Sequence, residues 1–238
     1  AFSWSGALAS TTNCLNPAHY LKTGGSHPLS LAEPAEDRVY LRFQTGWASK
    51  YECEGLDLWD GSLCAFVPEI QYREWVGKIW YGVSTDHQNH AELKYRLDYV
   101  KELGNWTVMP WYEHSFVFPG DKGIPRPGLK TTYRFSDRWF AGTDLYWQYN
   151  NHTFRGYYAA FAGLHEEIAD CVRVDATIRY GYNGGYVGPV VHHGSNALDY
   201  NLSFTFRATS RLTVELFTNF SQALTVLSRK GLGNDFYY

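Results

Sequence analysis

The sequence around residue 194 holds residue types that can carry out catalysis. Residues 192–196 read HHGSN, which places His193 two positions before Ser195. A histidine that takes the proton of a serine hydroxyl creates the nucleophile of many hydrolases. The cluster falls in a glycine-rich stretch that we expect to be a loop, and a motif this short often occurs by chance. We therefore predict that the protein is not an enzyme, and we assign no catalytic residue.

Residues 85–90 read TDHQNH and gather Asp86, His87 and His90, whose oxygen and nitrogen atoms can bind a metal ion. No cysteine and no further acidic residue adjoins them, so an exposed polar loop explains the cluster better. We expect no metal site and no other cofactor. The net charge of −3, without a basic run, also argues against a nucleic-acid partner.

The most numerous chemical groups are charged side chains that occupy every second position of long segments. Residues 91–100 read AELKYRLDYV, in which Glu92, Lys94, Arg96 and Asp98 alternate with apolar or aromatic residues. A period of two is that of an extended strand with one polar and one apolar face. The same alternation, with no convincing helix in between, predicts eleven antiparallel strands, at 39–49, 64–73, 76–84, 91–100, 106–116, 129–135, 141–149, 155–165, 172–182, 198–207 and 212–221.

The lengths of the strands and of their connections indicate a membrane barrel. Connections alternate between short and long, as in barrels with tight turns at one rim and loops at the other. The strands run to about 9–11 residues, which suits a tilted crossing of a bilayer. Aromatic residues make up 18% of the chain, and those near strand ends suit the two membrane interfaces: Trp47, Tyr72, Trp75, Trp106, Trp139, Tyr149 and Tyr182.

A soluble β-sandwich or barrel would also alternate, but it would pack its apolar face inside. The many full charges on the polar face favour the membrane form. We therefore predict an all-β fold, an antiparallel transmembrane β-barrel of about twelve strands in a bacterial outer membrane, in contact with outer-membrane lipid and lipopolysaccharide. Residues 39–238 form the barrel. Residues 1–38 lack alternation and would be a periplasmic tail, a plug or a docking segment, and the absence of an initiator Met indicates a processed chain.

Residues 45–61, TGWASKYECEGLDLWDG, resemble the opening segment of a family of uncharacterised Gram-negative outer-membrane β-barrel proteins. The closing GNDFYY at 233–238 resembles the start of the last strand in that family. This chain has Glu54 before Gly55, where the family pattern has arginine. The resemblance implies a β-barrel in the outer membrane and brings no catalytic residues.

The polar face of such a barrel lines its lumen, where basic residues outnumber acidic ones. This excess indicates a narrow channel for small polar or anionic solutes. The same charges could instead form a salt-bridged core, and the protein would then be a structural scaffold that anchors a larger envelope complex, through a protein partner or a second copy. We assign these lumen-lining residues: Arg42, Arg73, Lys78, Glu92, Lys94, Arg96, Asp98, Glu113, Lys130, Arg134, Asp144, Arg173, Asp175, Arg179, Asp199, Arg207 and Glu215.

A third and less favoured alternative is a lipid hydrolase. Outer-membrane phospholipases carry a His-x-Ser-Asn-Gly signature, and His193, Ser195 and Asn196 follow this order. This chain resembles the signature only in part, because Ala197 stands where those enzymes have glycine.

The four cysteines suit an oxidising compartment rather than zinc, because no Cys-x-x-Cys pair occurs. Cys53 and Cys64 flank the first long loop, whereas Cys171 lies in a turn at the opposite rim and Cys14 precedes the strand that starts there. A bridge needs Cα atoms within about 7 Å. The predicted disulfides are therefore Cys53–Cys64 and Cys14–Cys171.

Eleven strands cannot close an antiparallel barrel that has both termini at one rim, because closure then needs an even number. We predict a twelfth strand that begins at Asp235. Only the short stretch DFYY follows from that position, so residues 1–38, a partner chain or further sequence must complete the strand.

Overall fold

The computed structural model describes residues 2–6, 39–49, 51–53, 56–59, 61–86, 91–118, 123–150, 153–185, 193–209, 212–229 and 233–237. Strands dominate these residues, and one five-residue helix, α2 (Thr225–Arg229), follows β15. The strands are β1 (Phe2–Gly6), β2 (Val39–Ala48), β3 (Tyr51–Cys53), β4 (Leu56–Trp59), β5 (Leu63–Tyr72), β6 (Trp75–Ser84), β7 (Ala91–Tyr99), β8 (Lys101–Leu103), β9 (Trp106–Phe118), β10 (Ile124–Arg134), β11 (Trp139–Asn150), β12 (Thr153–Ala169), β13 (Val172–Gly184), β14 (His193–Arg207), β15 (Thr213–Ala223) and β16 (Asp235–Tyr237).

Within the described ranges, no helix is both long and apolar enough to cross a membrane.

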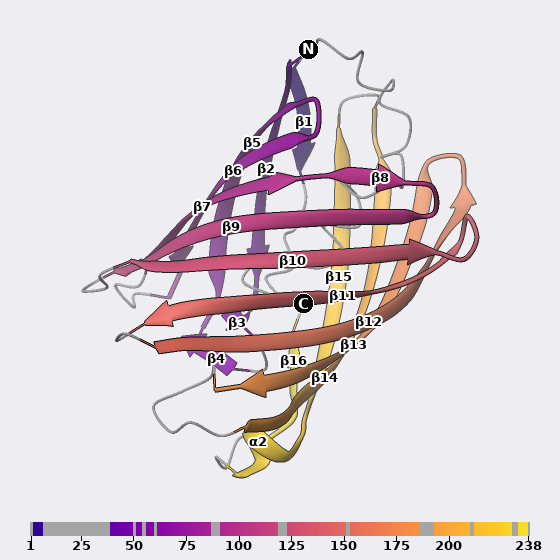
Figure 1. The fold of residues 1–238 in the computed structure, drawn as a ribbon. Coiled ribbons are helices and arrows are strands. Elements are labelled where there is room, and N and C mark those ends of the chain that lie inside the picture. The colour runs from indigo at the N-terminus through magenta and orange to yellow at the C-terminus, as the bar shows by residue number, and fades with distance from the viewer. Residues whose placement is uncertain are drawn as a thin grey trace.

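One large sheet contains every strand except the β3–β4 hairpin, which lies within the first long loop. Its strands follow chain order from β1 to β16, with β8 paired beside β9, and all pairs but one are antiparallel (Figure 1). The all-β class is thus confirmed, and each of the eleven predicted strands is present. The start of β16 at Asp235 also matches the predicted start of the twelfth strand.

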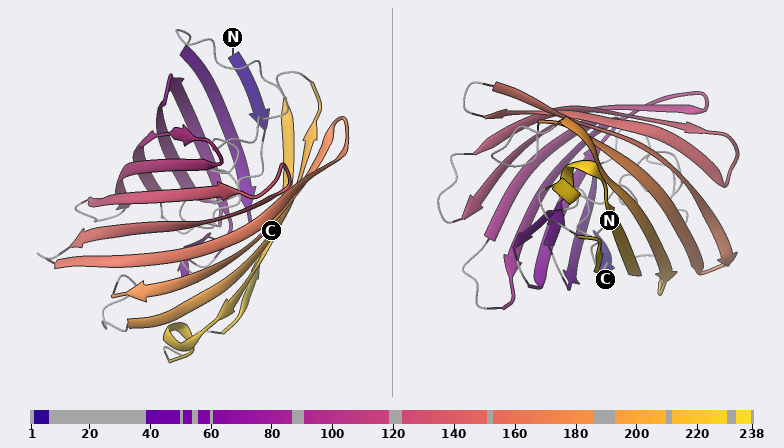
Figure 2. Two further views of the ribbon diagram at one scale, coloured as in Figure 1. Left: turned by 45° about the vertical axis from the view of Figure 1, so that its right-hand side comes forward. Right: turned by 90° about the horizontal axis from the view of Figure 1, so that it is seen from below.

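The sheet curves into a barrel-like shape without closing. Its hydrogen-bonded path ends at β1, which pairs in parallel with residues 41–45 of β2, and at β16, which pairs with residues 219–221 of β15. The two end regions nevertheless approach each other, because Ala48 of β2 and Phe217 of β15 share one buried cluster. Figure 2 shows the curvature, with the indigo strand β1 between the purple and yellow parts of the sheet. A parallel β1 was not part of the predicted topology.

Several strands run beyond their predicted ends. The start of β10 at Ile124 places Pro125 and Pro127 inside a strand, paired with His114 and Tyr112 of β9. Proline lacks the N–H that a sheet interior uses, so a loop was the natural expectation for this stretch. The start of β14 at His193 likewise places His193, Ser195 and Asn196 on a strand, where a loop was predicted.

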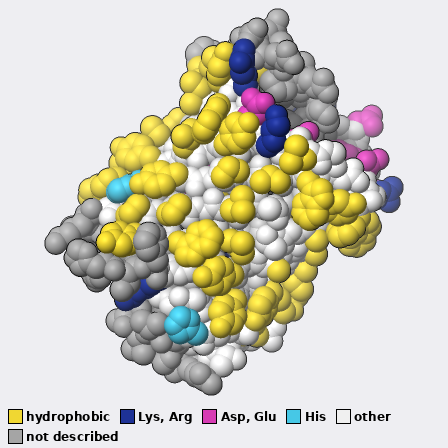
Figure 3. Space-filling view, in the orientation of Figure 1, with side chains coloured by type: hydrophobic (Ala, Val, Ile, Leu, Met, Phe, Trp, Pro, Cys, Tyr) yellow, Lys and Arg dark blue, Asp and Glu magenta, His cyan; other side chains and the backbone are white. Residues whose placement is uncertain are grey.

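The two faces of the sheet differ as the alternation predicted. The outward face carries large apolar side chains that are exposed along the strands, among them Leu41, Ile70 and Leu97. Figure 3 shows this surface on one side of the molecule, where hydrophobic side chains cover the strands and the charges lie mainly near the strand ends. Charged residues alternate with them on the inward face and are buried, for example Lys94 and Asp98, both 0% exposed.

Exposed aromatic residues gather at both rims. Tyr72, Trp75, Trp106 and Trp139 flank the short turns, and the rings of Trp75 and Tyr99 contact each other at a tilt, with 4.9 Å between their centroids. Trp47, Tyr149 and Tyr182 lie near the opposite ends of their strands and are also exposed. Ion pairs occupy the turn rim, Lys101–Glu74 at 3.6 Å and Arg138–Glu166 at 3.0 Å.

Candidate functional site

The inward face of β2, β5, β6, β7, β9 and β10 holds a continuous chain of ion pairs. Sheet register places six of its charged residues directly opposite one another across these strands, in the order Arg42, Glu69, Lys78, Arg96, Glu113 and Arg126. Opposite charges face each other at every step but one, because Lys78 and Arg96 are both cations. With Asp98 added, we call these seven residues the ion-pair chain.

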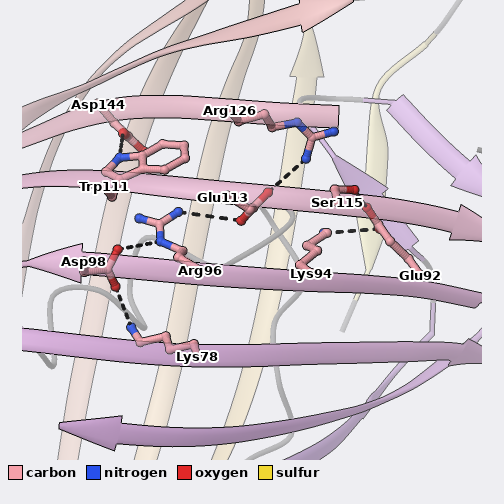
Figure 4. Close-up of polar contacts among 10 residues, drawn as sticks. All are labelled: Lys78, Glu92, Lys94, Arg96, Asp98, Trp111, Glu113, Ser115, Arg126 and Asp144. Carbon is pink, nitrogen blue, oxygen red and sulfur yellow. Dashed lines mark hydrogen bonds and ion pairs between the residues drawn. The ribbon is translucent and has the colours of Figure 1, made fainter. Parts of the chain in front are cut away.

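Asp98 offsets the repulsion between these two cations by pairing with both of them. It lies two residues beyond Arg96 on β7 and accepts from Arg96 Nε at 2.6 Å, while its other oxygen lies 3.2 Å from Lys78 Nζ (Figure 4). Like charges directly opposite in a sheet destabilise it, so the carboxylate between them converts a repulsive step into two attractive ones.

The remaining links of the ion-pair chain range from 3.0 to 3.8 Å. Arg42 lies 3.1 Å and Lys78 3.4 Å from the carboxylate of Glu69. Glu113 lies 3.8 Å from Arg96 and 3.0 Å from Arg126, which donates to it. Except for Arg42, every member is buried. Burial removes both ions from water at a large cost, and this cost is offset only where each charge has close partners, as here.

A second group beside this chain involves Lys94 and Glu92. The ammonium of Lys94 lies 3.2 Å from Glu92 and 4.3 Å from the centre of the Trp80 ring. Ser115 donates to the other oxygen of Glu92 at 2.6 Å. Figure 4 shows both groups side by side, on the same face of the strands.

Aromatic side chains fill the space between the ions. The guanidinium of Arg96 lies 3.9 Å from the centre of the Trp111 ring, and Trp111 donates to Asp144 at 3.4 Å. Lys130 lies 5.0 Å from the ring of Phe161. A buried apolar cluster accompanies them on the inward face, and its members are Leu63, Ala65, Val67, Trp80, Met109, Trp111, Tyr146, Tyr157 and Ala159. This part of the interior is therefore packed with side chains.

Strands β13 to β15 carry two further ion pairs. Arg173 donates to Asp175 at 3.0 Å, and Arg179 lies 3.6 Å from Asp199, which accepts from Ser221 at 2.7 Å. Uncharged polar residues lie between these pairs on the same face.

The structure places most of the predicted lumen residues on the buried inward face. Arg42, Arg134 and Arg207 are only partly buried, and Arg73 is exposed. The residues that are buried there are Lys78, Glu92, Lys94, Arg96, Asp98, Glu113, Lys130, Asp144, Arg173, Asp175, Arg179, Asp199 and Glu215.

The assignment of Arg73 to the inward face is wrong. Its strand ends at Tyr72, and Arg73 occupies the turn before β6 with a positive φ of 52°. Its guanidinium lies over the ring of Tyr72, 5.3 Å from the centroid. Alternation predicts the face on which a side chain lies only while the backbone stays extended, and the turn at Arg73 ends the extended backbone.

The fully buried charges on the inward face are close to balance. The expected excess of cations counted Arg73, which lies in a turn, and arginines that are only partly buried. Among described residues, the buried cations are Lys78, Lys94, Arg96, Arg126, Lys130, Arg173 and Arg179, and the buried anions are Glu69, Glu92, Asp98, Glu113, Asp144, Asp175, Asp199 and Glu215. The two buried sets nearly balance, and the partly buried Arg42, Arg134 and Arg207 add positive charge to the same face.

Sequence reasoning missed Arg126, because the prolines on both sides of it indicated a loop. A signal was nevertheless present: Arg126 lies four residues before Lys130 and two before Gly128, which continues the alternation of β10. Ser115, Ser221 and the uncharged polar residues of β13 to β15 were also left out, since only charged side chains were considered.

The structure describes only part of the two clusters with catalytic or metal-binding residue types. Ser195 shares a 2.6 Å hydrogen bond with the hydroxyl of Tyr180, and no hydrogen bond between Ser195 and His193 is found there. Asp86 bonds to Ser84, whereas His87 and His90 lie outside the described residues. No group of metal-ligating side chains is found in the part of the chain that the structure describes.

The predicted disulfides are not formed in the structure. Cys64 and Cys171 are free, while Cys14 and the side chain of Cys53 lie outside the described residues. Cys64 lies on the same face as the exposed Phe66 and Ile70, so Cys53 would have to reach the outward face to bond with it. Peptide mapping without reduction tests this pairing. A Cys14–Cys53 bridge would contradict the predicted rim arrangement.

Comparison with known proteins gives no relative: no protein-family model matches the chain, and neither a curated protein nor a solved structure is significantly similar to it. The resemblance to outer-membrane barrels therefore stays a prediction.

Proposed function

We propose that this chain is an outer-membrane β-barrel that serves as a structural scaffold, with an interior held closed by its own ion pairs. The ion-pair chain carries this proposal. It runs unbroken from Arg42 to Arg126 across six neighbouring strands, and aromatic and aliphatic side chains pack beside it. Charges that neutralise each other leave no fixed field to attract a permeating ion.

The outward face supports the membrane location. Large apolar side chains are exposed along the strands, and aromatic residues gather at both rims. In water such a surface would promote aggregation, whereas in a bilayer it contacts lipid chains and interfacial headgroups. The proposed partners are outer-membrane lipid and lipopolysaccharide, and an envelope protein or a second copy would dock at the rims.

Conductance in planar lipid bilayers tests the scaffold function. The purified chain, refolded in detergent, is expected to insert without a steady ionic current, while a known porin in the same membrane conducts. Insertion is checked separately by flotation of the chain with lipid vesicles. A steady current with anion selectivity would overturn the scaffold and support the channel expected from the sequence.

A second function has its own supporting observation. Strands β13 to β15 carry a row of buried amides and hydroxyls whose polar atoms have no hydrogen-bond partner within the described part of the chain. Such a row of uncharged polar groups fits the passage of small neutral polar solutes rather than of ions. Swelling of proteoliposomes in sugar solutions measures this passage, and swelling equal to that of protein-free liposomes would exclude it.

A further inference from the structure

Three uncharged polar residues form a straight row across β13, β14 and β15. In the sheet register Thr177 is opposite Asn201, and Asn201 is opposite Asn219. All three lie on the buried inward face, where Asn219 is 1% and Asn201 9% exposed. Directly opposite residues in a sheet have Cβ atoms about 4.5–5.5 Å apart, so the row presents two amides and a hydroxyl side by side. We call these three residues the neutral row.

The polar atoms of the neutral row are unsatisfied. Among the residues that the structure describes, the Oδ1 and Nδ2 atoms of both Asn201 and Asn219 have no hydrogen-bond partner, and neither has Oγ1 of Thr177. Ser203, two residues beyond Asn201 and 0% exposed, has an unpaired hydroxyl as well. Buried amides and hydroxyls are normally paired, because each unpaired one forfeits its hydrogen bonds to water. Several unpaired groups in one buried row therefore indicate a place in the interior where a polar partner is missing.

The surroundings of the neutral row define the chemistry of that partner. Ion pairs flank the row on both sides, Arg173–Asp175 and Arg179–Asp199, so the nearest charges already have opposite partners. A charged solute would lose its hydration without gaining a free counter-charge. An amide offers a donor and an acceptor together, and so does a hydroxyl. A solute with several neighbouring hydroxyl groups matches this pattern.

We propose that the neutral row binds a neutral polyhydroxylated solute, a sugar or a polyol, through the amides of Asn201 and Asn219 and the hydroxyl of Thr177. The inference deepens the second proposed function, the passage of neutral solutes, and names their class. Binding and passage are separate measurements, so a chain that binds the solute without swelling liposomes would lose the transport function and retain the site.

The test is calorimetric titration of the full chain in detergent micelles with glucose and sorbitol, and with glucosamine and gluconate as charged solutes of similar size. We expect saturable binding of the neutral pair and at least about tenfold weaker binding of the charged pair, as expected when one or more hydrogen bonds or a desolvated charge are lost. Equal affinity for all four solutes, or no heat from any of them, would overturn the proposal, and the second result would mean that ordered water alone satisfies the row.

Variants locate the binding on the neutral row. The double variant Asn201→Leu/Asn219→Leu removes both amides at similar volume and is expected to weaken glucose binding by about tenfold or more. Gln222→Leu is the matched control, because it removes an amide from β15 outside the neutral row and should leave the affinity unchanged. If the double variant does not fold, Thr177→Val removes one hydroxyl at nearly constant shape and should weaken binding severalfold. Unchanged affinity in the folded variants would place the solute elsewhere and refute the site.

Discussion

Replacing Asp98 with asparagine tests whether the ion-pair chain stabilises the sheet. The substitution keeps the shape of the side chain and removes the charge that separates Lys78 from Arg96. Those two cations face each other in the register, and Asp98 lies 3.2 Å from one and 2.6 Å from the other. Breaking a buried ion pair from one side costs about 3–5 kcal/mol. Lys78 keeps Glu69, and Arg96 keeps Glu113 and the Trp111 ring, so we expect the lower end, about 3 kcal/mol.

The assay is reversible urea unfolding of the full chain in lipid vesicles, followed by tryptophan fluorescence. Glu74→Gln is the matched control, because it breaks the exposed pair with Lys101, and exposed pairs contribute about 0–1 kcal/mol. The double variant Lys78→Met/Asp98→Asn removes one of the two facing cations, so it should cost less than the sum of the single changes. Equal costs for Asp98→Asn and Glu74→Gln, with additive behaviour of the double variant, would refute a stabilising ion-pair chain.

Two further predictions concern packing and activity. A Cβ added at Gly128 would approach the indole of Trp111 to 2.2 Å, so Gly128→Ala should lower the free energy of unfolding by about 1–3 kcal/mol. Gly233 has open space around it, so Gly233→Ala should leave the free energy of unfolding unchanged. Urea unfolding in vesicles compares the two variants. The chain should also release no fatty acid from phospholipid vesicles, with or without calcium, and hydrolysis that Ser195→Ala abolishes would instead establish the lipid hydrolase alternative.

The alternation of residue types was sufficient to predict the strands and the side of the sheet that each residue occupies. Glu92 and Lys94, for example, fall on the predicted buried face. This works because a strand has no freedom in the placement of successive side chains. The prediction failed where the backbone leaves the extended form, as at Arg73, and where prolines inside a strand looked like a loop, as around Arg126.

The partners within the interior were not predictable to the same degree. Register decides which charges meet, and a shift of two residues would bring Asp98 rather than Arg96 opposite Lys78 while leaving every face unchanged. Turn lengths fix that register, and the ends of the strands are the least certain feature of a sequence-based prediction. The neutral row was not predictable for a different reason. Asparagine and threonine are common on polar faces, and only the register shows that Asn201 and Asn219 lie opposite each other.

The contrast between the two parts of the interior follows from the cost of burial. An unpaired charge in an apolar surrounding costs far more than an unpaired amide or hydroxyl, so charged side chains are tolerated only where each has a close partner. The ion-pair chain meets this condition from Arg42 to Arg126. Hydrogen-bonding atoms that stay available for a solute cost less to bury when they belong to uncharged groups, as in Asn201 and Asn219. The charged part of the wall is therefore suited to hold the sheet together, and the neutral row to bind.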